Sequence, residues 1–499
     1  MIEKTITDKN IIDGIYDRYL KALEKRAAWE SYWEECYEYA LPQKSGIFKN
    51  DSLAVKKNAT VFDSTAETAV DRLASSLLSQ LTPPWSKWFG LEFGIDVTDE
   101  KERAEKVLQL ENIQKILQSH FDRSNFYVEA HQCYLDLITV GTAVMLFEEN
   151  AVGESSAFKF TAVPMNEIVF EDTGSGRLDS VFRRSLVPVG SLNTKFSSSV
   201  FDEKQQSIIS KNADKKVYVI EAVVPRITSL GQQGYNYFAF IDDTENVFGS
   251  VDKILLKTGV FSSSPFICFR WQKVSSEIYG RSPVMKALPD IKTANKVVEL
   301  ILKNASIAVS GIWQADDDGI LNPQNITLAP GTIIPKAVGS AGLTPIRSGA
   351  DFDVSQLVLS DLRANINRCL LADQLNATSG GARMTATEVI ERVNQISRIL
   401  GATYGRLQSE FLTPVIVRAV SILKRRGEIS DILVNGYEVD LKYQSPLAQN
   451  QILRDAENVL NWIKTLSDFG QDAFSVIDKK AVAIWLGKVF GVSEKLIVS

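Results

Sequence analysis

Two stretches of this chain, residues 278–309 and 383–427, decide its fold. The first reads IYGRSPVMKALPDIKTANKVVELILKNASIAV, and the second reads RMTATEVIERVNQISRILGATYGRLQSEFLTPVIVRAVSILKRRG. Apolar residues recur in both at helical spacing, so each stretch predicts a long amphipathic helix. Neither stretch carries a catalytic signature. A chain that devotes so much of its length to amphipathic helices is typical of a subunit of an assembly.

Capping residues and prolines mark the ends and bends of these helices. Ser282 and Pro283 have the residue types favoured at the N-cap and first positions of the first helix. Pro289 is expected to break or kink that helix, because proline removes one backbone hydrogen bond. The second helix is expected to kink at Pro414 and to end at Gly427.

One face of the first helix is basic. Lys292, Lys296 and Lys303 fall together on it at helical spacing. Such a face can meet DNA phosphates. A solvated face, or ion pairs with a neighbouring subunit, is the commoner origin of this pattern, so both interpretations stay open.

A turn-rich segment and a third helix lie between the two long helices. Residues 310–350 hold most turn formers of this half of the chain, among them Asp316, Asp317 and Asp318. Residues 351–373 predict a helix whose apolar positions are Val354, Leu357, Val358, Leu362, Ile366 and Leu370.

The loop at residues 374–384, QLNATSGGARM, consists mainly of small and polar residues. A plain connector and a moving, functional loop both fit this composition. The side chains and glycines available for a working role are Asn376, Thr378, Ser379, Gly380, Gly381 and Arg383.

The remaining chain is helical at both ends and β-rich in the middle. We expect a helix over 8–40, a second from Ser64, with Glu67 at capping-box spacing, to Pro83, and a third helical region over 100–145. Alternating β-branched and aromatic residues over 155–275 predict antiparallel strands, with a hairpin turn at 173–176 and PFICFRW (265–271) continuing the sheet. Short helices are expected over 447–499. The fold class is therefore α+β and mainly helical.

Composition limits the functional classes. The 499 residues allow two to four domains, and a net charge of −6 disfavours tight, static binding of nucleic acid, although not a passage through which DNA slides. Four widely spaced cysteines indicate reduced thiols rather than disulfides or a zinc site. The N-terminus lacks the apolar core of a signal peptide, and the longest apolar run, 137–147, is too short to span a bilayer.

No residue pattern points to catalysis, a cofactor or a metal. His120 and His131 have no ligand cluster around them, and neither a P-loop nor a GxSxG elbow occurs. Asp316 to Asp318 can ligate a divalent cation in principle, but the acidic pattern of a calcium loop is missing, which favours a solvated turn.

Several blocks together resemble a known family. LTPPWSKWFGL (81–91), PFICFRWQK (265–273), IYGRSP (278–283), RMTATEV (383–389), FLTPVIVRAVSILKRRG (411–427) and YQSPLA (443–448) occur in the order found in the head-to-tail connector, or portal, proteins of short-tailed, T7-like bacteriophages. Each block alone is weak, but their order is specific. Related chains often continue into a longer helical tail than this sequence has.

The resemblance implies a dodecameric ring at one capsid vertex, with double-stranded DNA moving through its central channel. It divides the chain into a wing (1–280, β-rich over 155–275), a first stem helix (281–309), a clip (310–350), a second stem helix (351–373), a tunnel loop (374–384), a kinked wing helix with a return strand (385–446) and a crown (447–499).

The resemblance also implies partners and a location. The clip, with Asp316, Asp317 and Asp318, would dock the terminase large subunit, and the ring would meet the scaffold and capsid proteins and a tail adaptor protein, with no membrane involved. Assembly would take place in the host cytoplasm. Two rivals are a structural tail or adaptor ring without a DNA channel and, less favoured, a metal-dependent nuclease built on the three aspartates.

Overall fold

A computed structural model of the 499-residue chain shows how these segments fold. It describes residues 2–48, 61–84, 86–93, 100–174, 176–196, 201–227, 233–244, 246–248, 253–310, 313–315, 343–345, 352–372, 401, 403–430, 439–443, 456, 458–466 and 477–489. Most of the predicted clip, the whole tunnel loop and residues 385–400 of the long second helix lie outside the described residues.

Helices make up most of the described chain. The α-helices are α1 (Ile2–Ala40), α2 (Thr65–Leu81), α3 (Glu100–Arg123), α4 (Phe126–Val140), α5 (Leu192–Lys195), α6 (Glu203–Lys211), α7 (Pro283–Ser310), α8 (Phe352–Cys369), α11 (Thr413–Arg426) and α13 (Lys479–Val489). Three 3₁₀ turns, η1 (Pro42–Lys44), η2 (Met165–Glu167) and η3 (Val189–Ser191), and one π-helical turn, η6 (Gln408–Leu412), complete this set.

The strands form four small antiparallel sheets. They are β1 (Phe89–Phe93), β2 (Thr142–Glu149), β3 (Phe158–Val163), β4 (Ile168–Glu171), β5 (Ser180–Pro188), β6 (Lys216–Ile227), β7 (Gln233–Asp242), β8 (Ile254–Phe261), β9 (Phe266–Arg270), β10 (Trp313–Ala315), β11 (Leu343–Pro345) and β12 (Val439–Tyr443). The sheet orders are β4-β5-β6-β7-β8, β3-β2-β9, β1-β12 and β10-β11.

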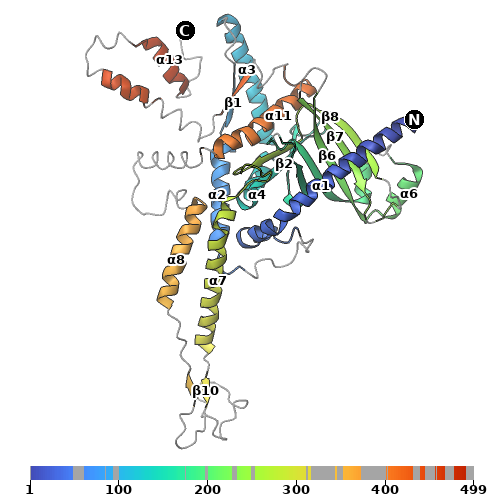
Figure 1. The fold of residues 1–499 in the computed structure, drawn as a ribbon. Helices are drawn as coiled ribbons and strands as arrows, with labels where there is room; N and C mark the ends of the chain where they lie inside the picture. The colour runs from blue at the N-terminus through green and yellow to red at the C-terminus, as the bar shows by residue number, and fades with distance from the viewer. Residues whose placement is uncertain are drawn as a thin grey trace, which may run out of the picture.

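The elements form a body with a long projection. Figure 1 shows α7 and α8 side by side, leaving the body and leading to the β10–β11 hairpin at its far end. The N-terminal half of α1 lies on the five-stranded sheet, where Ile12, Ile15 and Tyr19 pack against Phe182 and Phe240.

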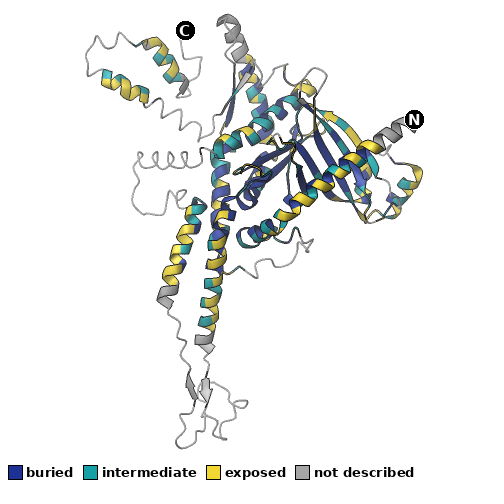
Figure 2. Cartoon of the chain, in the orientation of Figure 1, coloured by how far each residue is buried: buried dark blue, intermediate teal, exposed yellow. Residues whose placement is uncertain are grey.

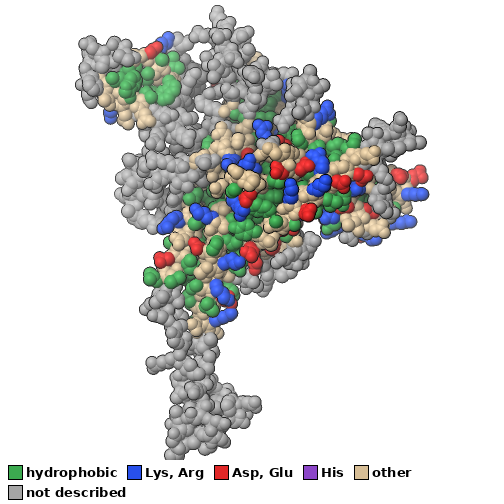
Figure 3. Space-filling view, viewed as in Figure 1, with side chains coloured by type: hydrophobic (Ala, Val, Ile, Leu, Met, Phe, Trp, Pro, Cys, Tyr) green, Lys and Arg blue, Asp and Glu red, His purple; other side chains and the backbone are tan. Residues whose placement is uncertain are grey.

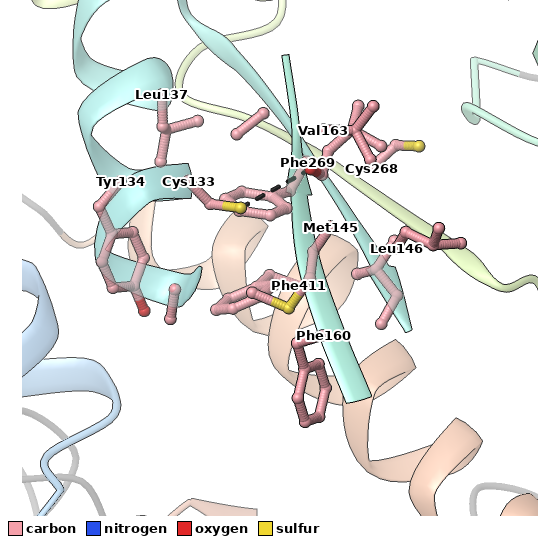
Figure 4. Close-up of a cluster of buried hydrophobic side chains, with 14 of the residues drawn as sticks. Cys133, Tyr134, Leu137, Met145, Leu146, Phe160, Val163, Cys268, Phe269 and Phe411 are labelled. Carbon is pink, nitrogen blue, oxygen red and sulfur yellow. Dashed lines mark hydrogen bonds between the residues drawn. The ribbon is translucent and has the colours of Figure 1, made fainter. Parts of the chain in front are cut away.

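The main core lies where α4 meets the three-stranded sheet and η6. Figure 4 shows side chains from α4, β2, β3, β9 and η6 gathered in one cluster, which includes Tyr134, Phe160, Phe269 and Phe411. The rings of Phe269 and Phe411 lie 4.3 Å apart between centroids. Each such buried aromatic side chain contributes roughly 1.5–3 kcal/mol to folding. Through Phe411, this cluster joins η6 and the following helix α11 to the β-rich body.

The helical predictions for the N-terminal half are largely confirmed. The aromatic stripe of α1 is buried at Trp33 and Tyr37, and α2 ends at Leu81 immediately before the two prolines. The region 100–145 is not one helical unit, because α3 ends at Arg123 and the chain enters strand β2 after Gly141. The apolar run 137–147 therefore spans the end of a helix and a buried strand.

Two local predictions are wrong. Ser64 occupies the N-cap of α2 but makes no side-chain capping bond; instead Asp63 Oδ1 accepts a hydrogen bond from the Thr65 amide at 2.9 Å. Strand β9 (PFICFRW) does not continue the five-stranded sheet. It pairs with β2 in the three-stranded sheet, with Thr142 opposite Arg270, because buried apolar strands can pair with any partner of matching register.

Pro289 does not break α7. The Met285 carbonyl, which would normally accept a bond from residue 289, accepts one from the Tyr32 hydroxyl of α1 at 3.1 Å. The hydrogen bond that the proline cannot donate is thus replaced by one from a side chain of α1, and the helix continues as one element.

A π-helical turn precedes Pro414, the position at which the sequence predicts a kink. The turn η6 ends at Leu412, two residues before the proline, and the Thr413 amide donates to the Gln408 carbonyl, five residues back. The widened turn accommodates a residue that lacks an N–H. Gly427 then ends α11 in the left-handed conformation, at φ +73°, as expected.

A close backbone contact joins the α4–β2 corner to the start of α7. A Cβ added at Gly280 would lie 2.1 Å from the Gly141 carbonyl oxygen, and Gly141 itself has φ +81°. The Gly280 amide donates to Thr142 Oγ1 at 2.8 Å, and the Ser282 hydroxyl donates to the Thr139 carbonyl at 2.9 Å. Ser282 Oγ also accepts from the Met285 amide at 2.8 Å, which confirms it as the N-cap. We call residues 139–142 and 280–282 the wing–stem joint.

Gly280→Ala is expected to destabilise the protein by about 2 kcal/mol or more, because the added methyl group meets backbone on one side and Arg270 Cβ on the other. Urea unfolding measures the effect. Gly14→Ala is the matched control: nothing lies within 4 Å of its Cβ position in α1, so alanine there should leave stability equal or raise it by up to about 1 kcal/mol. Equal stability of the two variants would contradict the packing role of the joint.

Candidate functional site

The stem pair α7 and α8 is fixed to the body by polar contacts at its upper end. Asn295 of α7 accepts hydrogen bonds from the amides of Phe62 and Asp63 at 2.6 and 3.1 Å. Arg363 of α8 pairs with Asp63 at 2.7 Å, although Asp63 is almost fully buried. The segment before α2 therefore holds both stem helices in place.

The basic face of α7 is balanced by carboxylates. Lys292 lies 3.1 Å from Glu35 of α1, and Glu299 lies between Lys296 at 3.0 Å and Lys303 at 2.6 Å. The hydrogen bond and charge of Glu35 raise the pKa of Lys292, and the bonds from Lys303 and Lys296 lower the pKa of Glu299. All three lysines remain exposed, so contact with DNA or with a neighbouring subunit stays a prediction.

The stem carries an exposed apolar surface that the sequence did not lead us to expect. Leu300 and Leu302 on α7 are 53% and 52% exposed, and Leu357 and Val358 on α8 are 65% and 45% exposed. We call these four residues the stem apolar patch; green side chains of the stem stand at the surface in Figure 3, and its exposed positions are yellow in Figure 2.

Leu357 and Val358, two of the predicted apolar positions of this helix, are exposed in one chain. Leu359, Ile366 and Leu370 are the buried positions of this helix. The chain is apolar on two sides of α8, but α7 covers only one of them. The run VVELIL (297–302) in α7 also places apolar residues on more than one face of its helix. This pattern is the sequence signal that could have revealed the patch.

The hairpin β10–β11 closes the far end of the stem. Trp313 stands opposite Pro345, and Ala315 stands opposite Leu343, which agrees with a small β-containing clip. Asp316, Asp317 and Asp318 follow directly after β10 but lie outside the described residues. The same holds for Asn376, Thr378, Ser379, Gly380, Gly381 and Arg383 of the loop.

A buried ion pair connects the π-turn to the wing–stem joint. Arg270 at the end of β9 pairs with Glu410 of η6 at 2.6 Å, and its guanidinium also donates to the carbonyls of Ile278 and Gly176 at 3.1 Å each. The Arg270 amide donates to Glu410 Oε2 at 3.0 Å. One side chain therefore joins the kinked helix, the segment that leads into α7 and the β4–β5 turn. The composition of PFICFRW gave no sign of this role.

The described residues offer little for catalysis. In those parts of the chain, no three histidine, cysteine or acidic side chains come together as metal ligands would. His120 is used structurally: Nε2 pairs with Glu428 at 2.8 Å, and Nδ1 accepts from the Ala157 amide at 3.2 Å. Burial raises the pKa of Cys36 to about 12, which suits an inert thiol. No helix among the described residues is long and apolar enough to cross a bilayer.

Comparisons with known proteins give one family. Residues 13–498 match the family described as bacteriophage head to tail connecting protein. The probable portal protein of Bordetella phage BPP-1 is 25% identical, over 97% of this chain and 88% of its own length. The portal proteins of Salmonella phage epsilon15 and Escherichia phage T7 are 24% and 20% identical, over 97% and 84% of this chain and 88% and 76% of their own lengths.

One solved structure is also similar in outline. A chain in the virion of a native gene transfer agent particle aligns over 86% of this chain and 92% of its own length, with 11% identity and a TM-score of 0.38.

In the Asp63→Asn variant, the free energy of unfolding is expected to fall less between neutral and acidic pH than it does in the wild type. Burial alone would raise the pKa of Asp63, but the hydrogen bonds from Thr65 and Arg363 outweigh it and hold the pKa below its ordinary value. A carboxylate with a lowered folded pKa stabilises above about pH 4, its unfolded value, and loses this contribution as pH falls through the folded value. Unfolding free energies measured by urea between about pH 2 and 7 should therefore depend less on pH in the variant.

Asp71→Asn, on the exposed side of α2, is the matched control and should keep the wild-type pH dependence. Parallel stability curves for Asp63→Asn and the wild-type chain would show that this carboxylate does not anchor α8.

Proposed function

Because the chain belongs to the bacteriophage head to tail connecting protein family, we propose that it works as the subunit of a ring-shaped portal whose mechanism is passive. Its function is that of a portal and head–tail connector at a capsid vertex, and its place is the virion. The observation that carries this conclusion is the family match over residues 13–498, which includes the wing, the stem and the C-terminal region. The fold class is α+β, as expected.

The ring is a homododecamer in which each stem packs against its neighbours. The stem apolar patch supports this arrangement, because its large apolar side chains are exposed on α7 and α8, and exposed apolar surface on a soluble protein marks sites of association. Closed rotational symmetry lets one patch meet a different surface of the next copy until the ring closes. A ring of this kind leaves no apolar stem surface in water.

Ring formation is expected to fail when charge is placed in the stem apolar patch. In the double variant Leu300→Glu, Leu357→Glu, each change removes roughly 1.5–3 kcal/mol of apolar burial per contact and buries a carboxylate. Both positions are exposed in one chain, so the subunit should fold normally. Native mass spectrometry should show at least about a tenfold loss of rings.

Val152→Glu is the matched control, because Val152 is 90% exposed in the turn between β2 and β3, away from the stem. Rings of the double variant at wild-type protein concentration would refute the role of the patch.

DNA passes through the bore, and the loop at 374–384 contacts it there. Asn376, Thr378, Ser379, Gly380 and Gly381 supply small, polar surface, and Arg383 supplies a cation for phosphate, so the contact carries no base specificity. The net charge of −6 supports sliding rather than gripping. Lys292, Lys296 and Lys303 are already paired with carboxylates, which makes them secondary candidates for contact with DNA.

The clip at 310–350, including Asp316 to Asp318, docks the terminase large subunit, which supplies ATP hydrolysis. The ring meets the scaffold and capsid proteins during assembly in the host cytoplasm and later binds a tail adaptor protein. The chain itself is not an enzyme in this proposal: it provides a channel, a nucleus for capsid assembly and a docking platform. Cys36, Cys133 and Cys268 are buried, and His120 pairs with Glu428, so these four side chains have structural surroundings.

Arg383→Ala should leave ring assembly intact and change DNA packaging or retention, because a cation at the loop would be lost without any change in the stem. Packaged DNA per particle and leakage after packaging measure the two effects. Arg383→Lys keeps the charge and should behave as the wild type does. If both quantities matched wild type in Arg383→Ala, the DNA role of the loop would be refuted.

A further inference from the structure

A cavity of about 450 Å³ lies between helix α11 and the three-stranded and five-stranded sheets. Arg418 and Arg425 of α11 line one side, and Lys257 and Phe261 of β8 line another. The remaining wall comes from β2, β6, β7, the 150–151 turn and the start of β9. None of the roles proposed above involves this cavity.

The acidic residues of the cavity already have cationic partners. Glu149 pairs with Arg425, and Glu148 lies 3.7 Å from Lys159. The third acid, Glu221, is buried and accepts a bond from the Tyr237 hydroxyl at 2.7 Å. Two further cations, Arg183 and Lys195, lie 3.5 and 3.7 Å from Glu221.

Two cations in the same lining have no carboxylate partner among the described residues. Arg418 is only 4% exposed, and its guanidinium donates to the carbonyls of Phe147 and Ser263, both at 2.7 Å. The rings of Phe147 and Phe261 lie 5.8 and 5.2 Å from it. These neutral groups hydrogen-bond the cation but do not neutralise it. Burial and the charge of Arg425 lower its pKa to about 9, while the charges of Glu148 and Glu149 act in the opposite direction, so Arg418 stays charged at neutral pH.

The second cation, Lys257, is exposed at the cavity mouth. Side chains alternate along a strand, so Lys257, Gly259 and Phe261 share one face of β8. A Cβ added at Gly259 would meet only the Tyr237 ring, at 3.9 Å. This glycine leaves an open, aromatic floor between Lys257 and Phe261, to which Leu146 and Phe266 add apolar surface.

We propose that this cavity binds an acidic peptide segment of a partner protein, with one carboxylate between Arg418 and Lys257 and a neighbouring apolar side chain on Phe261 and Phe266. Glu148 and Glu149 offset the charge of Arg418 only from a distance, and a buried cation is best compensated by a carboxylate in direct contact with it in the same low-dielectric site. Nucleic acid fits less well, because its repeated phosphates would meet Glu148, Glu149 and Glu221 on the same walls.

Fluorescence anisotropy with the purified full-length chain tests this proposal. The probe is a fluorescein-labelled hexapeptide with a single glutamate among valines and serines, compared at low salt with the same peptide carrying lysine in place of the glutamate and with a short DNA duplex. The glutamate peptide should bind, and Lys257→Glu should weaken its binding by about tenfold or more, since an attractive charge becomes a repulsive one. Lys257 is exposed, so this variant should fold as the wild type does.

Lys204→Glu is the matched control: Lys204 is an exposed lysine on α6, outside the cavity lining, and its reversal should change binding by less than about twofold. Arg418→Met is a second variant, to be used only after its unfolding transition has been shown to resemble that of the wild type. Equal weakening by Lys257→Glu and Lys204→Glu, no binding of the glutamate peptide, or stronger binding of the lysine peptide or the duplex would each overturn the proposal. None of these outcomes bears on ring assembly or on the loop at 374–384.

Discussion

The contact between Gly141 and Gly280 is the constraint that lets a helical stem leave a β-rich body. Each glycine lies against the other's backbone, at a distance that no Cβ could occupy. Because the Gly280 amide and the Ser282 hydroxyl both bond to the α4–β2 corner, the first turn of α7 is fixed by the close backbone contact and these two hydrogen bonds, in addition to the burial of Val284 and Met285. The direction of the stem follows from that geometry. A side chain at either glycine would push the start of α7 away from the body.

The wing–stem joint is also connected to the π-turn η6, which leads into α11. Arg270 lies at the end of β9, beside the joint, and receives its only carboxylate partner among the described residues, Glu410, from the π-turn before Pro414. Because Arg270 also bonds to the Ile278 carbonyl, a change in the π-turn is transmitted to the residues that lead into α7. A buried ion pair of this kind contributes specificity of arrangement more than net stability.

Local features of the fold could be predicted from the sequence, and choices between partners could not. The cap at Ser282 and the stop at Gly427 depend on backbone chemistry within a few residues, so each appears as predicted. The partner of β9, the compensation of Pro289 by Tyr32 and the pairing of Arg270 depend on segments more than a hundred residues away. The periodicity of a segment does not indicate which distant segment of the chain will pack against it.

The stem apolar patch shows a different limit. Periodicity identified Leu357 and Val358 as apolar positions, and both are exposed in a single chain. A helix with apolar residues on two sides needs two neighbours, and α7 is one of them. Our proposal therefore assigns the exposed apolar residues of α8 to contact between subunits. A ring-shaped conduit requires such surfaces, because its channel forms only where subunits meet.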